Sequence, residues 1–223
     1  MSEGGVFYRR NLPHIHPKDG MFFITFRLAG SLPQRVLKAL REEKESRIKA
    51  LEKRLSGKEL FREKYRLESL FFGKYDGLLD RASEGPQWLK EIHLARIVVD
   101  KIHDLDGKRY RLISYCVMSN HVHLLIDTMG HDEIAVTNVS GKTLNYPVTD
   151  CLRLLKGSTA RWCNLELKRN GAFWHKESYD HYVRDEEELA RIIQYVLNNP
   201  VKAHLVKDWQ EWKLSYLNES FST

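Results

Sequence analysis

The sequence predicts one globular domain that combines β-strands with amphipathic helices. Hydrophobic residues make up 42% of the 223 residues and charged residues 30%, which is the balance of a folded protein and not of a disordered chain. Two segments, 21–28 and 110–126, are rich in aromatic and β-branched residues and are predicted to be strands. Three other segments repeat apolar residues at helical spacing. The chain is long enough to bury one core and to carry insertions.

The hydropathy pattern and the cysteine content indicate the cellular compartment of the protein. No apolar run approaches the ~18 residues that a membrane-spanning helix needs, and residues 1–5 lack the charged and apolar regions of a signal peptide. Cys116, Cys151 and Cys163 are odd in number and form no Cys-x-x-Cys pair, so we expect ordinary buried thiols. A cytoplasmic protein is therefore expected.

The first strand, residues 21–28, follows a basic segment that prolines interrupt, residues 8–17. In that segment His14 and His16 are separated by one residue, so they form a rival pair of metal ligands. Their position between prolines and ahead of a strand favours contact with nucleic acid or solvent over metal ligation.

A charged helical insertion is predicted at about 34–80. Its apolar stripe is narrow, so we expect a helical hairpin whose turn lies at residues 56 and 57. The mixed charges of the insertion are expected to form a solvated face. The stripe consists of Ile48, Leu51 and Leu55.

A further helix is predicted to begin at Pro86 and to run through Val99, because its apolar residues share one face that can pack on a sheet. After a turn, residues 110–126 are predicted to form one long strand. Ser119 and Asn120 are expected to make a bulge or a bend inside that strand.

The long strand carries the sequence His121-Val122-His123. Successive side chains on a strand point to opposite faces, so the two imidazoles project to the same side, where both can reach one cation. A short motif of this kind also occurs without a metal. Two hydrogen-bonded histidines on a half-exposed sheet face therefore remain the alternative.

Residues 128–149 are predicted to form a loop insertion. Asp150 is expected to cap a helix that runs to about residue 169 and ends at the dipeptide Asn170-Gly171. This helix is the most basic one in the chain, and both a solvated surface and a phosphate-binding surface remain open for it. Its basic residues are Arg153, Lys156, Arg161, Lys168 and Arg169.

Asp185 and Glu188 form the capping-box pattern of a last helix, which is stopped by Pro200. Tyr195 and Asn199 are four residues apart and therefore lie on one face of that helix. If this face lies beside the histidine pair, the Asn199 amide oxygen can complete a metal site that keeps positions open for substrate oxygens. Tyr195 would then point at the group that the metal holds.

Three stretches of the chain together resemble the REP-associated tyrosine transposases, which belong to the single-tyrosine HUH transposases. The stretches are Arg-Arg-Asn-Leu-Pro-His at residues 9–14 with the strand that follows, Met-Ser-Asn-His-Val-His-Leu-Leu at 118–125, and Tyr-Val-Leu-Asn-Asn-Pro-Val-Lys-Ala at 195–203. The resemblance covers nearly the whole chain in order, including Phe173-Trp174 and residues 179–184.

The resemblance implies an α+β fold of the ferredoxin-like, or RRM-like, kind, with an antiparallel sheet, helices packed on one face and a helical insertion. It implies a single HUH transposase domain over residues 1–223. The insertions at about 34–80 and 128–149 look larger than a minimal family domain needs. They are expected to set DNA preference or oligomeric state.

The resemblance further implies that His121 and His123 are metal ligands and that Tyr195 is the nucleophile. The implied reaction is metal-dependent cleavage and rejoining of single-stranded or hairpin DNA that contains palindromic repeats. In it the Tyr195 phenolate attacks phosphorus, which forms a 5′-phosphotyrosine and releases a 3′ hydroxyl. The implied cofactor is Mg²⁺ or Mn²⁺. A free phenol, with a pKa of about 10, is mostly protonated at neutral pH, so a nearby cation or base must help it.

A formal charge of +6 permits DNA binding through phosphate contacts. The protein is expected to be a monomer or a homodimer and to bind no membrane. The side chains expected to contact DNA are basic groups or histidines of the first segment, the basic helix and the stretch before the last helix. They are Arg9, Arg10, His14, Arg153, Lys156, Arg161, His181 and Arg184.

Besides the two insertions, one residue departs from better-known relatives, and two other functions remain open. Insertion-sequence transposases place a glutamine where this chain has Asn199, whose arm is shorter. Tyr179 and Tyr182 are other candidate nucleophiles, but neither has an asparagine one helical turn away. A non-catalytic module that binds single strands would use the same fold, although no aromatic RNA-binding pattern is seen. A replication-initiator or relaxase-like nickase would use the same chemistry.

Overall fold

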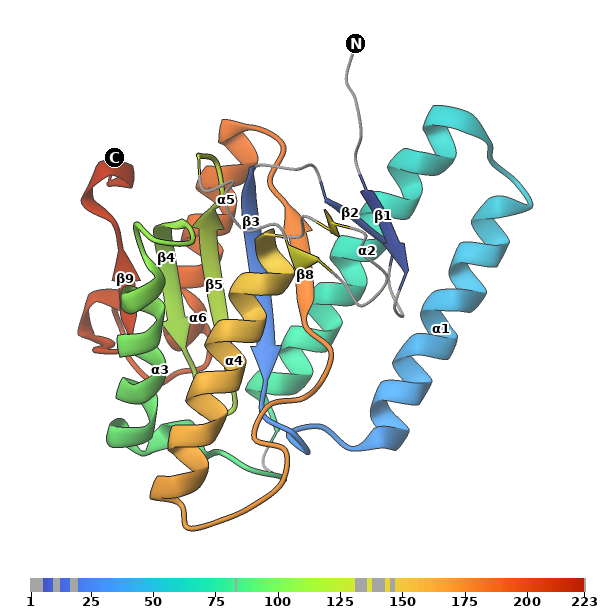
Figure 1. Cartoon of the computed structure of the whole chain (residues 1–223). Coiled ribbons are helices and arrows are strands. Elements are labelled where there is room, and N and C mark those ends of the chain that lie inside the picture. Colours follow the sequence, from blue (N-terminus) through green and yellow to red (C-terminus); the bar gives the residue numbers. More distant parts are fainter. Residues whose placement is uncertain are drawn as a thin grey trace. The chain divides into compact units, whose positions relative to one another are not determined.

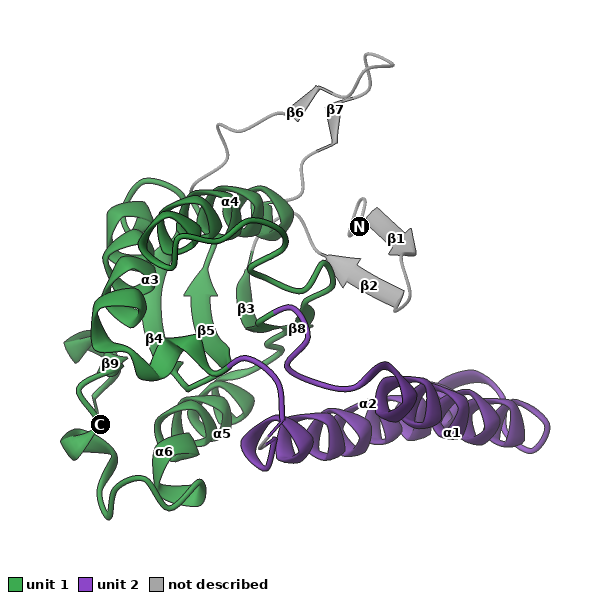
Figure 2. Cartoon of the chain, turned by 90° about the horizontal axis from the view of Figure 1, so that it is seen from below, with its two compact units in different colours: residues 1–28, 87–223 green, residues 29–86 purple. Residues whose placement is uncertain are grey.

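The computed structural model describes residues 20–82, 84–130 and 147–222, together with the backbone of four short strands. These are β1 (Val6–Arg9) paired with β2 (Pro13–His16), and β6 (Val136–Thr137) paired with β7 (Thr143–Leu144). The chain forms two compact units, which Figure 2 colours separately. The sheet unit contains Met1–Leu28 and Gln87–Thr223, and the helical unit contains Ala29–Pro86.

Five antiparallel strands form the centre of the sheet unit, in the order β8-β3-β5-β4-β9 (Figure 1). Without β9 at the edge, this is the strand order of a ferredoxin-like sheet, in which the chain runs β-α-β-β-α-β. The predicted α+β fold with an antiparallel sheet is therefore confirmed. The strands are β3 (Met21–Arg27), β4 (Arg111–Val117), β5 (His121–Asp127), β8 (Tyr179–Tyr182) and β9 (Ser215–Leu217).

Helices cover both faces of this sheet (Figures 1 and 2). The crossover helices α3 (Ile92–Leu105) and α4 (Pro147–Glu166) lie on one face, as predicted, and α5 (Glu186–Leu197) lies on the other. The expectation that the helices pack on one face of the sheet is therefore wrong for α5. Residues 121–126 are all buried, because α5 covers the side of β5 that would otherwise face water.

The strand predicted over residues 110–126 is in fact two strands, β4 and β5, which form a tight hairpin. Val117 pairs with Val122, and the amide of Met118 donates to the carbonyl of His121 at 2.9 Å. Ser119 and Asn120, expected to form a bulge or bend, therefore lie in the turn. The turn segment contains no glycine or proline, and apolar residues continue on both sides of it, so the reversal is not visible in the sequence.

The main core lies between the sheet and the two crossover helices. Val122, Leu124 and Ile126 of β5 alternate into it, and α3 contributes one apolar face. The predicted helix from Pro86 instead starts as a 3-10 turn, Trp88–Lys90, before α3. The α3 residues in the core are Leu94, Ala95, Val98, Ile102 and Leu105.

The C-terminal elements also differ in detail from the prediction. Helix α4 begins at Pro147, before the predicted cap Asp150, while α5 begins as predicted with Asp185 Oδ1 accepting from the amide of Glu188 at 2.8 Å. Three short helical segments complete the unit. These are α6 (Asn199–Lys202), Trp209–Glu211 and Glu219–Phe221.

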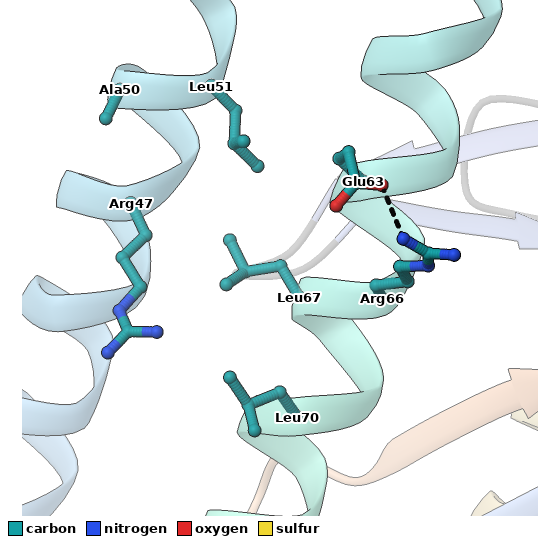
Figure 3. Close-up of a pocket in the computed structure, with 7 residues that line it drawn as sticks. All are labelled: Arg47, Ala50, Leu51, Glu63, Arg66, Leu67 and Leu70. Atoms are coloured by element: carbon teal, nitrogen blue, oxygen red, sulfur yellow. Dashed lines mark hydrogen bonds and ion pairs between the residues drawn. The ribbon is translucent and has the colours of Figure 1, made fainter.

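The helical unit is the predicted hairpin, formed by α1 (Gln34–Glu52) and α2 (Gly57–Asp80). Ion pairs join the two helices, among them Lys74 to Glu43 at 2.6 Å and Lys64 to Glu52 at 2.6 Å. An open hollow of about 450 Å³ lies between the two helices (Figure 3). Its lining is Arg47, Ala50, Leu51, Glu63, Arg66, Leu67 and Leu70.

Along the described residues, each helix is too short or too polar to serve as a membrane span.

The three cysteines are buried and free, as predicted. Burial raises the pKa of the Cys151 thiol and that of the Cys163 thiol to about 12. A thiol reagent reacts with the thiolate, so both groups should be inert in the native protein. Ellman's reagent at pH 8 should release almost no chromophore until the protein is unfolded, when all three thiols should react. Rapid reaction of the native Cys151 or Cys163 would contradict their burial.

Candidate metal and nucleophile site

The two histidines of β5 point to the same side of the sheet, as the strand periodicity predicts. His121 and His123 are 1% and 0% exposed, and their Nε2 atoms lie 3.0 Å apart. Val122, between them, packs into the main core on the opposite face. Both rings are buried, so the face is not half-exposed, and two histidines that hydrogen-bond without a metal remain the alternative.

The other ring nitrogens of this pair are held by oxygen atoms. Nδ1 of His121 lies 2.6 Å from Oδ1 of Asn120, and Nδ1 of His123 lies 2.8 Å from Oγ1 of Thr25, its cross-strand neighbour on β3. When both Nδ1 protons are donated to these oxygens, each neutral ring presents a lone pair at Nε2. Metal-bound histidines in proteins are oriented in this way.

The spacing of the two Nε2 atoms fits one divalent ion. Two nitrogen ligands that lie about 2.1 Å from an octahedral ion, at a right angle, are about 3.0 Å apart. Without a cation, two facing lone pairs at that distance repel each other unless a proton lies between them. His121 and His123 could therefore hold a divalent metal ion.

Tyr195 lies beside this pair, because α5 packs on the same face of the sheet. Its ring centroid is 5.8 Å from that of His123 and 5.8 Å from that of Phe23, with both rings nearly perpendicular to it. Tyr195 is half-buried. The structure thus brings the predicted nucleophile and the predicted ligands together.

The rival tyrosines are placed differently. Tyr182 packs edge-on against Phe22 and belongs to the main core on the opposite face of the sheet. Tyr179 lies on the same face as Tyr195 and contacts Phe23, but it belongs to strand β8 and not to a helix.

Asn199 has the burial of a ligand or of a structural amide. Its side chain is fully buried, and its Nδ2 donates to the carbonyl of Tyr195 at 2.7 Å. Among the described residues, no donor reaches its Oδ1 atom. A buried amide oxygen without a donor is costly, and a cation would remove that cost.

Three residues of this region were not predicted to belong to a site. Thr25 and Asn120 hold the histidine rings, and the Nζ atom of Lys202 lies 5.6 Å from the centroid of the Tyr195 ring. Lys202 follows Tyr195 by seven residues, which is two helical turns, so the sequence alone could have placed both residues on one helix face. Thr25 could be found only from the register of β3 against β5.

The predicted DNA-binding residues of α4 are not brought to this site, because α4 covers the opposite face of the sheet. Arg153 forms an ion pair with Asp150 at 2.7 Å, and the Arg161 guanidinium stacks over Trp162, which is exposed. The Lys156 ammonium donates to the carbonyl of His175 at 2.8 Å and so holds the segment before β8.

His181 and Arg184 lie near the start of α5. Nε2 of His181 is 3.1 Å from Oε1 of Glu188, whose Oε2 accepts from the backbone amide of Arg184 at 2.9 Å. Glu188 thereby links β8 to the helix that carries Tyr195. The side chains of Arg9, Arg10 and His14, like that of His16, lie outside the described residues.

His175 follows the bridge between Leu28 and Trp174. Burial, and next the Arg27 guanidinium, lower the pKa of His175 below its ordinary value. Its Nδ1 accepts from the amide of Glu177 at 3.2 Å, which a neutral ring can do. His175 is therefore a neutral hydrogen-bonding group at neutral pH and not a cation for phosphate.

The chain is similar to a Haemophilus influenzae protein named as a REP-associated tyrosine transposase. The two are 26% identical over 104 residues, which cover 45% of this chain and 56% of the relative. The resemblance to the REP-associated tyrosine transposases is confirmed. An uncharacterised protein of the same organism is 24% identical over 101 residues, which cover 41% of this chain and 54% of that protein. The chain spans about half the length of the curated relatives it matches.

Among solved structures, the chain is similar to a REP-associated tyrosine transposase bound to a REP hairpin. The match covers 96% of this chain and 82% of that chain, with 16% identity and a TM-score of 0.49. No family model matches the chain.

Proposed function

We propose that the protein is a metal-dependent endonuclease and transposase that cleaves and rejoins hairpin-bearing single-stranded DNA through a 5′-phosphotyrosine. One observation carries the proposal: a buried histidine pair, with Nε2 atoms 3.0 Å apart, and the half-buried Tyr195 phenol share one sheet face. The similarity to a protein named as a tyrosine transposase supports DNA as the substrate. The formal charge of +6 is consistent with a phosphate backbone as partner.

His121 and His123 would hold the metal through Nε2, and Asn199 would add the oxygen that finds no donor among the described residues. Nitrogen and amide-oxygen ligands accept Mn²⁺ readily, and Mg²⁺ would depend more on substrate and water oxygens. When bound, such an ion polarises a phosphate oxygen and offsets charge at the reacting phosphorus.

Tyr195 would carry the covalent step. Its oxygen forms a bond to phosphorus, and the bond from phosphorus to the 3′ oxygen breaks, so the DNA 5′ side becomes linked to the protein. One phosphodiester replaces another of similar energy, so a free 3′ hydroxyl can reverse the step and join strands. The Phe23 and His123 rings, each 5.8 Å from the Tyr195 ring, fix its orientation.

A library of labelled DNA hairpins, incubated with the protein and Mn²⁺, tests this proposal. We expect a conjugate that resists denaturation, is lost with EDTA, and maps by mass spectrometry to the peptide containing Tyr195. Hairpin binding without a conjugate would instead support a non-catalytic binding module. Cleavage without rejoining of two strands would support a replication-initiator or relaxase-like nickase.

The Thr25 hydroxyl is expected to tune metal binding through His123. In Thr25→Val the His123 ring loses its Nδ1 partner, so Mn²⁺ affinity should fall about 10-fold. Valine has nearly the same shape and suits a strand, so the fold should persist. Thr159→Val makes the same change in α4 and should leave Mn²⁺ affinity unaltered in calorimetric titration. Equal affinities in all three proteins would remove Thr25 from the site.

For DNA contacts, the exposed side chains of Arg184 and Arg161 are stronger proposals than Lys156, whose ammonium already binds backbone carbonyls. His181 is a weaker proposal than the two arginines, because one of its ring nitrogens already lies 3.1 Å from the Glu188 carboxylate. Arg9, Arg10, His14 and Arg153 remain proposals from the sequence.

A further inference from the structure

Helix α1 of the helical unit is only partly covered. All of its residues, Gln34–Glu52, are described, and none of them is buried. Its apolar residues Leu40, Ile48 and Leu51 are half-buried. A helix in water is stabilised mainly by packing of its apolar face, and exposed ion pairs such as Lys64 to Glu52 contribute little. Contact with another apolar surface would therefore stabilise this helix.

The hollow of Figure 3 is the open part of the helical hairpin. Leu51 of α1 and Leu67 and Leu70 of α2 point into the space between the two helices. Leu67 is buried, but the side chain of Leu70 is 48% exposed. The hollow therefore has an apolar floor that is open to solvent. The surface formed by the residues that line the hollow is called the hollow face.

The charges of the hollow face are balanced within the helical hairpin. Nη2 of Arg47 lies 2.9 Å from Oε1 of Glu43, and Nη1 of Arg66 lies 2.9 Å from Oε1 of Glu63. A surface that binds nucleic acid needs cations that carboxylates of the same chain do not offset. The pairing therefore disfavours DNA as the partner. It fits a second surface that is also apolar at its centre and balanced in charge at its rim.

We infer that the hollow face binds the hollow face of a second copy of this chain, so that two helical hairpins form a four-helix bundle across a two-fold axis. In such a pair the exposed Leu70 of each copy enters the hollow of the other copy. The insertion then sets the oligomeric state and not the DNA preference. The inference goes beyond the proposed function and does not depend on it.

The size of the hairpin is sufficient for such a dimer. Helices of 19 and 24 residues are about 28 and 36 Å long, and two helices side by side are roughly 20 Å wide. Two such faces bury roughly 1,200 Å² in total, which is the lower end of the range for specific interfaces.

Sedimentation equilibrium of the full chain, without DNA or metal, tests the inference. The wild type should form a dimer with a micromolar or lower dissociation constant. Leu70→Glu brings a carboxylate from each copy into the apolar centre and should raise that constant about 100-fold or more. Ala50→Glu makes the same test from α1, and Leu70→Met, which keeps the volume, should stay within about 3-fold. The matched control is Leu205→Glu in the sheet unit, where the leucine is also 48% exposed, and it should dimerise like the wild type.

Hydrogen exchange separates loss of the dimer from loss of the fold. Leucine and glutamate have similar helix propensities, so Leu70→Glu should keep the helical spectrum in circular dichroism. In the wild type the amides of α1 should exchange more slowly as protein concentration rises, because the second copy stabilises the helix. In Leu70→Glu their exchange should not depend on concentration, and the amides of β5 should stay as protected as in the wild type.

A wild-type protein that stays monomeric at all concentrations overturns the inference, as does a dimer that Leu70→Glu and Ala50→Glu leave intact. If the wild type is monomeric and Leu70→Glu weakens its affinity for hairpin DNA, the hollow face binds DNA and the inference is wrong. The proposed function is tested separately, since adduct formation plays no part in these measurements.

Discussion

Replacing Tyr195 with phenylalanine should abolish the covalent DNA adduct while hairpin affinity stays within about two-fold of the wild-type value. The substitution removes the one oxygen that can attack phosphorus and keeps the ring that packs against Phe23 and His123. A loss of about 1000-fold or more in adduct formation is expected, because no other nucleophile replaces a positioned phenol. The measurement is a denaturing gel of labelled hairpin after incubation with Mn²⁺.

Two matched variants control this experiment. Tyr182→Phe changes a tyrosine of the main core on the opposite sheet face, and Tyr179→Phe changes one on the same face but on strand β8. Both should form adduct at close to the wild-type rate. An undiminished adduct in Tyr195→Phe, or its loss in Tyr182→Phe, would show that the nucleophile lies elsewhere.

Substituting His123 with alanine should remove both metal binding and strand cleavage. Nε2 of His123 lies 3.0 Å from Nε2 of His121, and the His123 ring contacts the Tyr195 ring, so one substitution removes a proposed ligand and a ring that packs against the proposed nucleophile. We expect adduct formation to fall on the order of 1000-fold. Mn²⁺ binding, followed by the loss of the free-ion signal in electron paramagnetic resonance, should weaken in parallel.

The control for this substitution is His93→Ala, which removes an exposed histidine of α3 on the opposite face of the sheet. It should bind Mn²⁺ and form adduct like the wild type. Circular dichroism of His123→Ala should retain the native spectrum, which separates loss of the site from loss of the fold. Full activity of a folded His123→Ala protein would exclude the histidine pair from catalysis.

The fold was predictable where local periodicity decides the structure. The strand predicted over 21–28 is observed as β3 (Met21–Arg27), and the charged insertion forms the predicted helical hairpin, because each apolar pattern fits only one type of secondary structure. The reversal at Ser119 and Asn120 was missed, because apolar residues continue on both sides of a turn that lacks glycine and proline. The position of α5 on the second sheet face was also missed, because the apolar face of a helix does not reveal which face of the sheet the helix will cover.

For the candidate site, the sequence pointed to the histidine pair and Tyr195, which the structure brings together, but not to the residues that hold them. Periodicity placed His121 and His123 on one side, and resemblance selected Tyr195 among the tyrosines. Thr25 lies in another strand and reaches His123 only through the register of β3 against β5, which no local pattern encodes. Lys202 was overlooked because Pro200 marks a helix end in the sequence, although helical hydrogen bonds continue past it.

The position of the metal ion tests the shared site of the histidine pair and Tyr195 most directly. Crystals of the protein soaked in Mn²⁺ should give an anomalous difference peak between the Nε2 atoms of His121 and His123, on the sheet face where Tyr195 lies. A protein that binds Mn²⁺ at another place, or crystals in which this pair stays free of metal at saturating Mn²⁺, would contradict the proposed site.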